Sequence, residues 1–308
     1  MNRRQFFAAS VAVAGTGILA AETGTPLPII DTHQHLWDLK KFALPWVKEG
    51  SLLAKDHVTS DYLRATAGLN VVKAVYMEVD VAVEQQPGEA EYVLAICRRL
   101  DTPTVAAVIS GRPASDGFAK YLEPYRKLDL IKGVRQVLHG DSTPAGFCLD
   151  KNFVRGVRLL GDMGKSFDLC MRPGELLDAA KLIDECPGTR FILDHCGNGP
   201  VYTKDRSAWQ KGIAEVAKRK NVVGKVSGII AQTRPGKWKP DDLAPVINHT
   251  LEVFGPDRVM FAGDWPVCTL GATFKEWVAA LRTIVASRPE SEQRKLFHDN
   301  AERVYGLE

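Results

Sequence analysis

Short apolar runs recur along the whole chain, and most of them end at a polar residue. Their lack of strict apolar/polar alternation is typical of strands that are buried on both faces of a parallel sheet. The eight predicted strands are Ile29–His33, Val72–Glu78, Thr104–Ile109, Ile131–Gln136, Phe167–Met171, Phe191–His195, Val222–Ser227 and Val259–Gly263.

Between several of these runs, apolar residues recur every three or four positions, which predicts amphipathic helices. These helices are Glu89–Leu100, Phe153–Met163, Gly174–Asp184, Trp209–Arg219, Leu243–Phe254 and Thr273–Ala286. Eight strands with helical crossovers predict a (β/α)8 barrel, a TIM-like fold. The alternative, an open doubly wound sheet, would need a glycine-rich phosphate loop after its first strand, and Asp31–His35 is not one.

We expect one folded domain over residues 26–308, with three longer loops over one end of the barrel. These loops are Lys40–Asp61, Pro200–Ala208 and Ala231–Lys239.

The first 25 residues have the pattern of a bacterial export signal. Arg3-Arg4 precedes Phe6, and an apolar stretch without acidic residues runs from Ala8 to Leu19. Adjacent arginines ahead of a short apolar segment indicate the twin-arginine export machinery as a partner and a periplasmic or secreted location. The apolar stretch is short for a bilayer span, although an uncleaved membrane anchor is the alternative.

Composition excludes several classes of function. The chain has 40 basic and 37 acidic residues, for a formal net charge of +3, and no basic stripe, so we expect no nucleic-acid partner. Its six cysteines contain no Cys-x-x-Cys pair, which argues against a zinc ribbon or a disulfide scaffold.

Candidate chemistry lies at the ends of the predicted strands. His33 and His35 are two residues apart, so they would point to the same side of a strand. His195 and Asp264 end two later runs, and barrel enzymes carry their active sites at the carboxyl ends of strands. The candidate substrate contacts at or near such ends are Arg135, Arg172, Lys225 and Trp265. Arg135 could instead pair with an acid at a strand end.

Five motifs together resemble the amidohydrolase-related family. They are Asp31-Thr32-His33-Gln34-His35-Leu36-Trp37, Lys132-Gly133-Val134-Arg135, Leu193-Asp194-His195-Cys196-Gly197, Lys225-Val226-Ser227-Gly228 and Gly263-Asp264-Trp265-Pro266-Val267. The resemblance is strongest to the branch of fuconolactonases and pyrone-dicarboxylate lactonases. It implies a barrel of the metallo-dependent hydrolase type and hydrolysis of a cyclic ester, for which a sugar-acid or other carboxylated lactone is the expected substrate.

Two forms of the site remain open at this point. One divalent ion, zinc or manganese, could be held by His33, His35, His195 and Asp264. Without a metal, the three histidines could instead donate hydrogen bonds to the lactone carbonyl. In both forms Asp264 is the expected base. Lys132 starts its strand and is therefore at the wrong end of the barrel to bridge two ions.

Two other functions compete with a lactonase. One is a metal-dependent decarboxylase or hydratase, and the other is a non-catalytic periplasmic binding barrel. Homo-oligomers are common among barrel enzymes and are an expectation here. The chain also departs from the family pattern, with Gly263 where a serine is usual and Asn198 where a lysine is common.

Overall fold

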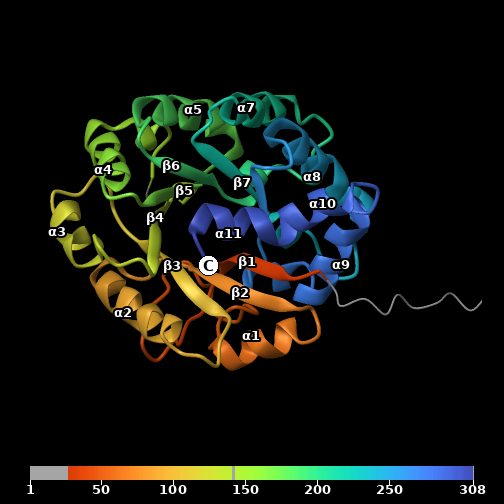
Figure 1. Cartoon of the computed structure of the whole chain (residues 1–308), viewed down its shortest axis with the longest axis horizontal. Helices are drawn as coiled ribbons and strands as arrows, with labels where there is room; N and C mark the ends of the chain where they lie inside the picture. Colours follow the sequence, from red (N-terminus) through yellow and green to blue (C-terminus); the bar gives the residue numbers. More distant parts are fainter. Residues whose placement is uncertain (1–26, 141–142, 308) are drawn as a thin grey trace, which may run out of the picture.

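The computed structural model describes residues 27–140 and 143–307, which form one parallel eight-stranded sheet in sequential order, curled into a nearly closed barrel (Figure 1). The strands are β1 Ile29–Gln34, β2 Val71–Met77, β3 Thr104–Ser110, β4 Ile131–Val137, β5 Ser166–Cys170, β6 Arg190–Leu193, β7 Val222–Val226 and β8 Val259–Phe261. All eight predicted strands are confirmed. Their ends shift by one or two residues, most visibly where β6 and β8 stop before the predicted polar residue.

Helices surround the barrel. They are α1 Thr59–Thr66, α2 Gln86–Cys97, α3 Phe118–Leu122, α4 Lys151–Asp162, α5 Leu176–Glu185, α6 His195–Asn198, α7 Ser207–Ala217, α8 Pro240–Phe254, α9 Phe274–Val285, α10 Glu290–Arg294 and α11 Asn300–Tyr305. The six predicted helices are confirmed. The last residues of the predicted loop Lys40–Asp61 belong to α1, and the short helices α3, α10 and α11 escaped the periodicity analysis.

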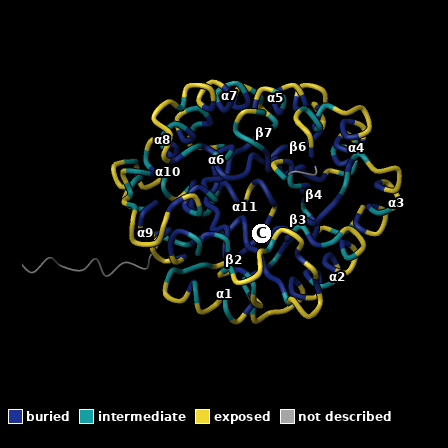
Figure 2. The backbone as a smooth tube through the Cα atoms, turned by 180° about the vertical axis from the view of Figure 1, so that it is seen from behind, coloured by how far each residue is buried: buried dark blue, intermediate teal, exposed yellow. Residues whose placement is uncertain are grey.

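The hydrophobic core has two layers. The larger layer lies between the sheet and the surrounding helices, so the strands are buried while the outward faces of the helices are exposed (Figure 2). The smaller layer fills the barrel itself with Ile30, Val75, Val108 and Met260, among others. Helix α11 lies across the amino-terminal end of the barrel, where Tyr305 packs against this inner layer (Figure 1). The barrel interior is thus packed, and only its carboxyl end is open for chemistry.

Backbone contacts join the first and last strands beyond their carboxyl ends. Asp264 N–H donates to His33 O at 2.8 Å, and His35 N–H donates to Trp265 O at 2.8 Å. The buried Asp31 carboxylate ties the same seam together, because it accepts from Gly263 N–H at 2.7 Å and from the Tyr62 hydroxyl at 2.8 Å. The seam holds two segments far apart in sequence in one fixed relation.

The predicted signal segment lies outside the described residues. Within the described part of the chain, none of the helices combines the length and the apolar character that a membrane crossing requires.

Candidate active site

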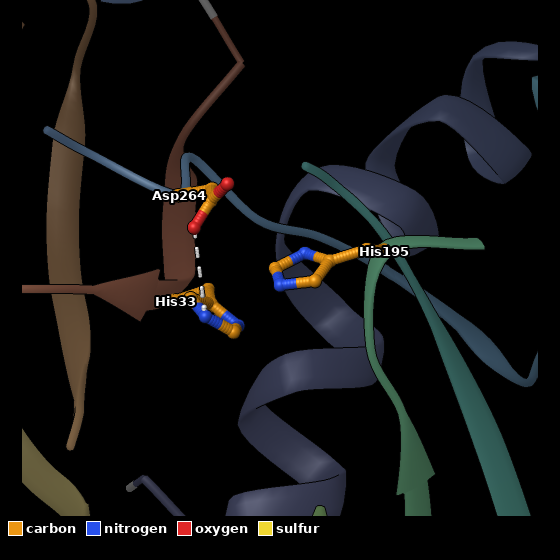
Figure 3. A group of neighbouring side chains, drawn as sticks. All are labelled: His33, His195 and Asp264. Atoms are coloured by element: carbon orange, nitrogen blue, oxygen red, sulfur yellow. Dashed lines mark ion pairs between the residues drawn. The ribbon is translucent and has the colours of Figure 1, made fainter. Parts of the chain in front are cut away.

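Four of the predicted residues meet at the carboxyl end of the barrel (Figure 3 shows three of them). Asp264 Oδ1 lies 3.3 Å from His35 Nε2 and 3.6 Å from His33 Nε2. The His33 ring centroid is 4.8 Å from that of His35 and 4.6 Å from that of His195. All four side chains are buried. The sequence prediction that His33 and His35 face the same side agrees with this geometry.

Left-handed backbone presents two of these side chains. His195 (φ 57°) and Asp264 (φ 54°) both adopt positive φ, a conformation that costs a residue with a side chain about 1–3 kcal/mol. Gly228 makes room for the first of them, since a Cβ at Gly228 would lie only 2.4 Å from the His195 ring. The chain accepts backbone strain here in order to aim the two groups at one point.

The glycine at position 263 has a packing reason. A Cβ there would lie 2.2 Å from the Phe274 ring and 2.7 Å from the Asp31 carboxylate. The Phe274 ring therefore occupies the space that the side chain of the family's usual serine would need. Asn198, the other departure, donates its amide to Met171 O at 2.8 Å and lines the cavity described below.

Hydrogen bonds indicate which nitrogen of each imidazole carries its proton. His35 Nδ1 lies 3.0 Å from Met77 O, so Nδ1 is the donor and, in the neutral tautomer that this bond selects, the electron pair is at Nε2. Arg135 Nη1 lies 3.1 Å from His33 Nε2, and because a guanidinium only donates, Nε2 is the acceptor. His195 Nδ1 pairs with the Ser227 hydroxyl at 2.9 Å, which leaves its Nε2 for the site.

Below the histidines lies a buried set of charges. Arg135 Nε binds Glu78 Oε1 at 2.6 Å, and Lys225 Nζ binds Asp168 at 2.7 Å and Asp194 at 3.1 Å. Asp194 also approaches His33 Nδ1 at 3.4 Å and Arg135 Nη1 at 3.7 Å. Together with Asp264, the set contains four carboxylates against two obligate cations.

Burial and charge set the ionisation of these groups. Burial alone would raise the pKa of Asp264, but His195, His35 and His33 outweigh it and lower that pKa to about 2. Burial lowers the pKa of His33 well below its usual 6.5 and lowers that of His195 as well. Burial also raises the pKa of Asp168, to about 6. At neutral pH the site therefore holds an ionised Asp264 beside two neutral imidazoles.

The donor set fits one divalent ion. The ligand atoms of His33, His195 and Asp264 all lie within 4.8 Å of one another. In addition, the His35 Nε2 electron pair faces the Asp264 carboxylate at 3.3 Å, an arrangement that favours a cation between the two. Imidazole nitrogen and carboxylate oxygen suit zinc or manganese. His33 differs from the others, because its Nε2 already accepts from Arg135.

Lys132 takes no part in this site. Its Nζ binds Asp129 at 2.9 Å and Gly306 O at 3.2 Å, beside the carboxyl-terminal residues that cover the other end of the barrel. The prediction that it cannot bridge two ions agrees with this position.

A cavity of about 380 Å³ opens above the four residues. It is lined by His35, Trp46, Val79, Asp80, Arg135, Val137, His139, Gly140, Cys170, His195, Asn198, Gly228, Ala231, Gln232, Asp264 and Val267.

Of the four predicted substrate contacts, only Arg135 lines this cavity, and it also pairs with the acid Glu78. Arg172 instead donates to the carbonyls of Leu138, Gly140 and Thr143, which orders the loop after β4. Lys225 is fully buried among carboxylates. Trp265 packs edge-on against Tyr62 and His57. The structure therefore gives these three a structural position away from the cavity, in contrast to the prediction.

Two residues outside the predicted set also lie at the site. In a continuous strand Asp194 and His195 would point to opposite faces, but Asp194 contacts His33 because β6 already ends at Leu193. His139 is exposed and lines the cavity. Its position directly after a strand was the available signal.

Comparisons with known proteins agree with this geometry. The family model described as amidohydrolase matches residues 30–307. The L-fucono-1,5-lactonase of Burkholderia multivorans is 27% identical over 90% of this chain and 96% of its own length. The L-rhamnono-gamma-lactonase of Scheffersomyces stipitis is 24% identical over 91% of this chain and 98% of its own.

Among solved structures, a zinc-bound amidohydrolase of Burkholderia multivorans superimposes with a TM-score of 0.80. It is 23% identical and aligns with 91% of this chain and 99% of its own. On the family match over nearly its entire length, the chain belongs to the amidohydrolase family.

Proposed function

We propose that this protein is a lactonase, which opens the ring of a cyclic ester by attack of water on its carbonyl carbon. The observation that carries the proposal is the ionised Asp264, held against His35 and His33 at the floor of a substrate-sized cavity. A non-catalytic binding barrel would not need a base so placed. Relatives named as lactonases that align over nearly their full length support the same reaction.

Asp264 moves the proton in this reaction. Its carboxylate takes a proton from the attacking water and returns it to the ring oxygen as the carbon–oxygen bond breaks. His35, whose Nδ1 donates to Met77 O, places its Nε2 beside the carboxylate, where one cation could contact both groups. His195, held by Ser227, points its free nitrogen toward the position of the ring carbonyl.

Asp264 is a weak base by itself, since its pKa is about 2. A divalent ion held by His35, His195 and Asp264, and by His33 once its Nε2 is released from Arg135, would polarise the ring carbonyl and make the water more acidic. The buried charges support such an ion, because four carboxylates exceed Arg135 and Lys225 by two charges. We propose zinc, the metal that the structural neighbour contains, with manganese as the second candidate.

The test is lactone hydrolysis by the purified protein, followed with a pH indicator in three states: as isolated, after chelation, and after zinc or manganese is returned. We expect activity that falls on chelation and recovers with metal. Activity that ignores chelation would keep the lactonase and assign the histidines to hydrogen bonding. Release of carbon dioxide without ring opening would identify a decarboxylase instead of a lactonase. Binding of a lactone without turnover would identify a non-catalytic binding barrel.

We also propose that residues 1–25 direct the protein to the periplasm by twin-arginine export. Arg3-Arg4 and the apolar segment after them support this location. Fractionation of cells that express the full chain tests it, with Arg3→Lys combined with Arg4→Lys as the variant. Loss of the periplasmic pool in the variant is expected. Equal distribution of the two proteins would contradict the proposal.

A further inference from the structure

The side chains that line the cavity walls indicate which substituents a substrate can carry. Val137, at the end of β4, and Trp46, Val79, Ala231 and Val267, in segments that follow other strands, line it. The Trp46 ring is held in place, because its indole N–H donates to Val79 O at 2.7 Å and its edge meets the Trp37 ring at 5.8 Å. A fixed apolar surface therefore covers the space next to the reacting carbonyl.

The cation expected to hold a substrate carboxylate already forms a buried ion pair with Glu78. Arg135 donates from Nε to Glu78 Oε1 at 2.6 Å, from Nη2 to Glu78 O at 2.7 Å and from Nη1 to His33 at 3.1 Å. The Nε–Nη2 side of the guanidinium, which could make a two-pronged contact to a carboxylate, is taken by Glu78. Arg135 is the only lysine or arginine among the described lining residues, so these supply no cation that is not already paired with an acid.

Most other polar groups of the lining are also used within the protein. Gln232 donates to Gly199 O at 3.0 Å and accepts from Val201 N–H at 3.2 Å. The Asp80 carboxylate accepts from Arg112 at 2.8 Å. Outside the catalytic set and Arg135, Asn198 Oδ1, Asp80 Oδ2 and the His139 ring are left among the described lining groups to meet a substrate. In a sugar lactone, most of the hydroxyl groups would lose their hydrogen bonds to water and face apolar side chains instead. That loss weakens binding.

We propose that the site selects a neutral lactone with an apolar substituent over carboxylated and polyhydroxylated lactones. This inference rests on the proposed function and narrows it to a substrate class. It runs against the expectation of a sugar-acid or carboxylated lactone that the sequence resemblance implies. The physical reason is that apolar substituents gain from burial against Trp46 and its neighbours, while anionic or hydroxylated ones lose solvation without replacement.

The experiment uses four lactones on the same five-membered ring. They are γ-valerolactone, γ-nonalactone, the γ-valerolactone analogue whose methyl group is a carboxylate, and a hexonic acid γ-lactone. Each kcat/KM is divided by the rate constant for spontaneous alkaline opening, which removes differences in intrinsic reactivity. We expect γ-nonalactone to exceed γ-valerolactone by about 10- to 100-fold, and the other two to fall below γ-valerolactone by about tenfold or more.

Variants locate the effect. Trp46→Ala should cut the preference for γ-nonalactone by about tenfold while γ-valerolactone changes less than about threefold, and Trp46→Phe should retain most of the preference. Leu52→Ala is the matched control, since Leu52 is 60% exposed on the same loop and does not line the cavity. Unequal effects on the two lactones cannot come from a general loss of folding.

The outcomes separate the two proposals. If the carboxylated or hexonic lactone is the best substrate, the inference fails and the lactonase stands. An equal loss on both alkyl lactones in Trp46→Ala would also overturn the inference. If none of the four lactones is opened in any metal state, both proposals fail.

Discussion

Replacing Glu89 by glutamine should remove a pH-dependent loss of stability that is built into the barrel wall. Glu89 is buried on α2, where its Oε1 accepts from Val79 N–H at 2.7 Å and from the Tyr76 hydroxyl at 2.9 Å. Its Oε2 has no hydrogen-bond partner in the described structure. Burial, followed by the negative charge of Glu78, raises the pKa of Glu89 from 4.5 to about 7.

The raised pKa of Glu89 determines whether stability rises or falls with pH. Because the folded-state pKa is raised, the folded protein holds the proton more tightly than the unfolded chain. The resulting stabilisation is fully present below pH 4.5, declines as pH rises, and is lost by about pH 7. The interval between the two pKa values corresponds to about 3 kcal/mol. Glutamine resembles the protonated acid and keeps an acceptor at Oε1, so Glu89→Gln should escape this loss.

The assay is thermal unfolding followed by tryptophan fluorescence between pH 4.5 and 8.5. Glu89→Gln should match the parent protein near pH 4.5 and exceed its Tm by about 6–12 °C at pH 8. Glu91→Gln is the control, because Glu91 is an exposed residue on the same helix. Parallel Tm curves for Glu89→Gln and the parent protein across this pH range would refute the reasoning.

Two further substitutions test the frame of the site. Gly228→Ala should lower kcat/KM by about 100-fold in steady-state kinetics, because its Cβ would lie 2.4 Å from the His195 ring. Gly236→Ala is the control, since Gly236 has a similar φ but open space around it, and it should keep kcat/KM. Lys225→Met should destabilise the fold by about 3–5 kcal/mol in urea unfolding, because it leaves Asp168 and Asp194 buried without their cation. Lys218→Met, at an exposed lysine, is the control. An effect of Lys225→Met no larger than that of Lys218→Met would contradict the role of Lys225 as the buried counter-ion.

The barrel was predictable because buried parallel strands have a local signature. Runs such as Phe191–Leu193 are apolar whatever the tertiary contacts, and strand alternation alone predicts that His33, on β1, and His35, just past its end, face the same side. The short helices α10 and α11 were missed, since few residues establish a period there. Helix α11 matters because it covers one end of the barrel, a role that depends on contacts distant in sequence.

Less of the site than of the fold could be predicted from the sequence. Arg172 and Lys225 look available in the sequence, but loop carbonyls bind one and buried carboxylates bind the other. No local pattern reveals where a cation is already neutralised. The place of Asp194 in the site cannot be read from the sequence for a different reason, because β6 ends early and the left-handed backbone at His195 breaks the strand alternation.

The most direct test of the central claim compares lactone opening by the parent protein and by Asp264→Asn. The asparagine keeps the shape of the side chain but cannot accept the proton of water, so kcat should fall by about 100- to 10,000-fold. Asp241→Asn, an exposed site on α8, should have no effect. A fully active Asp264→Asn enzyme would contradict the account, because the carboxylate around which the site is arranged would then have no part in the reaction.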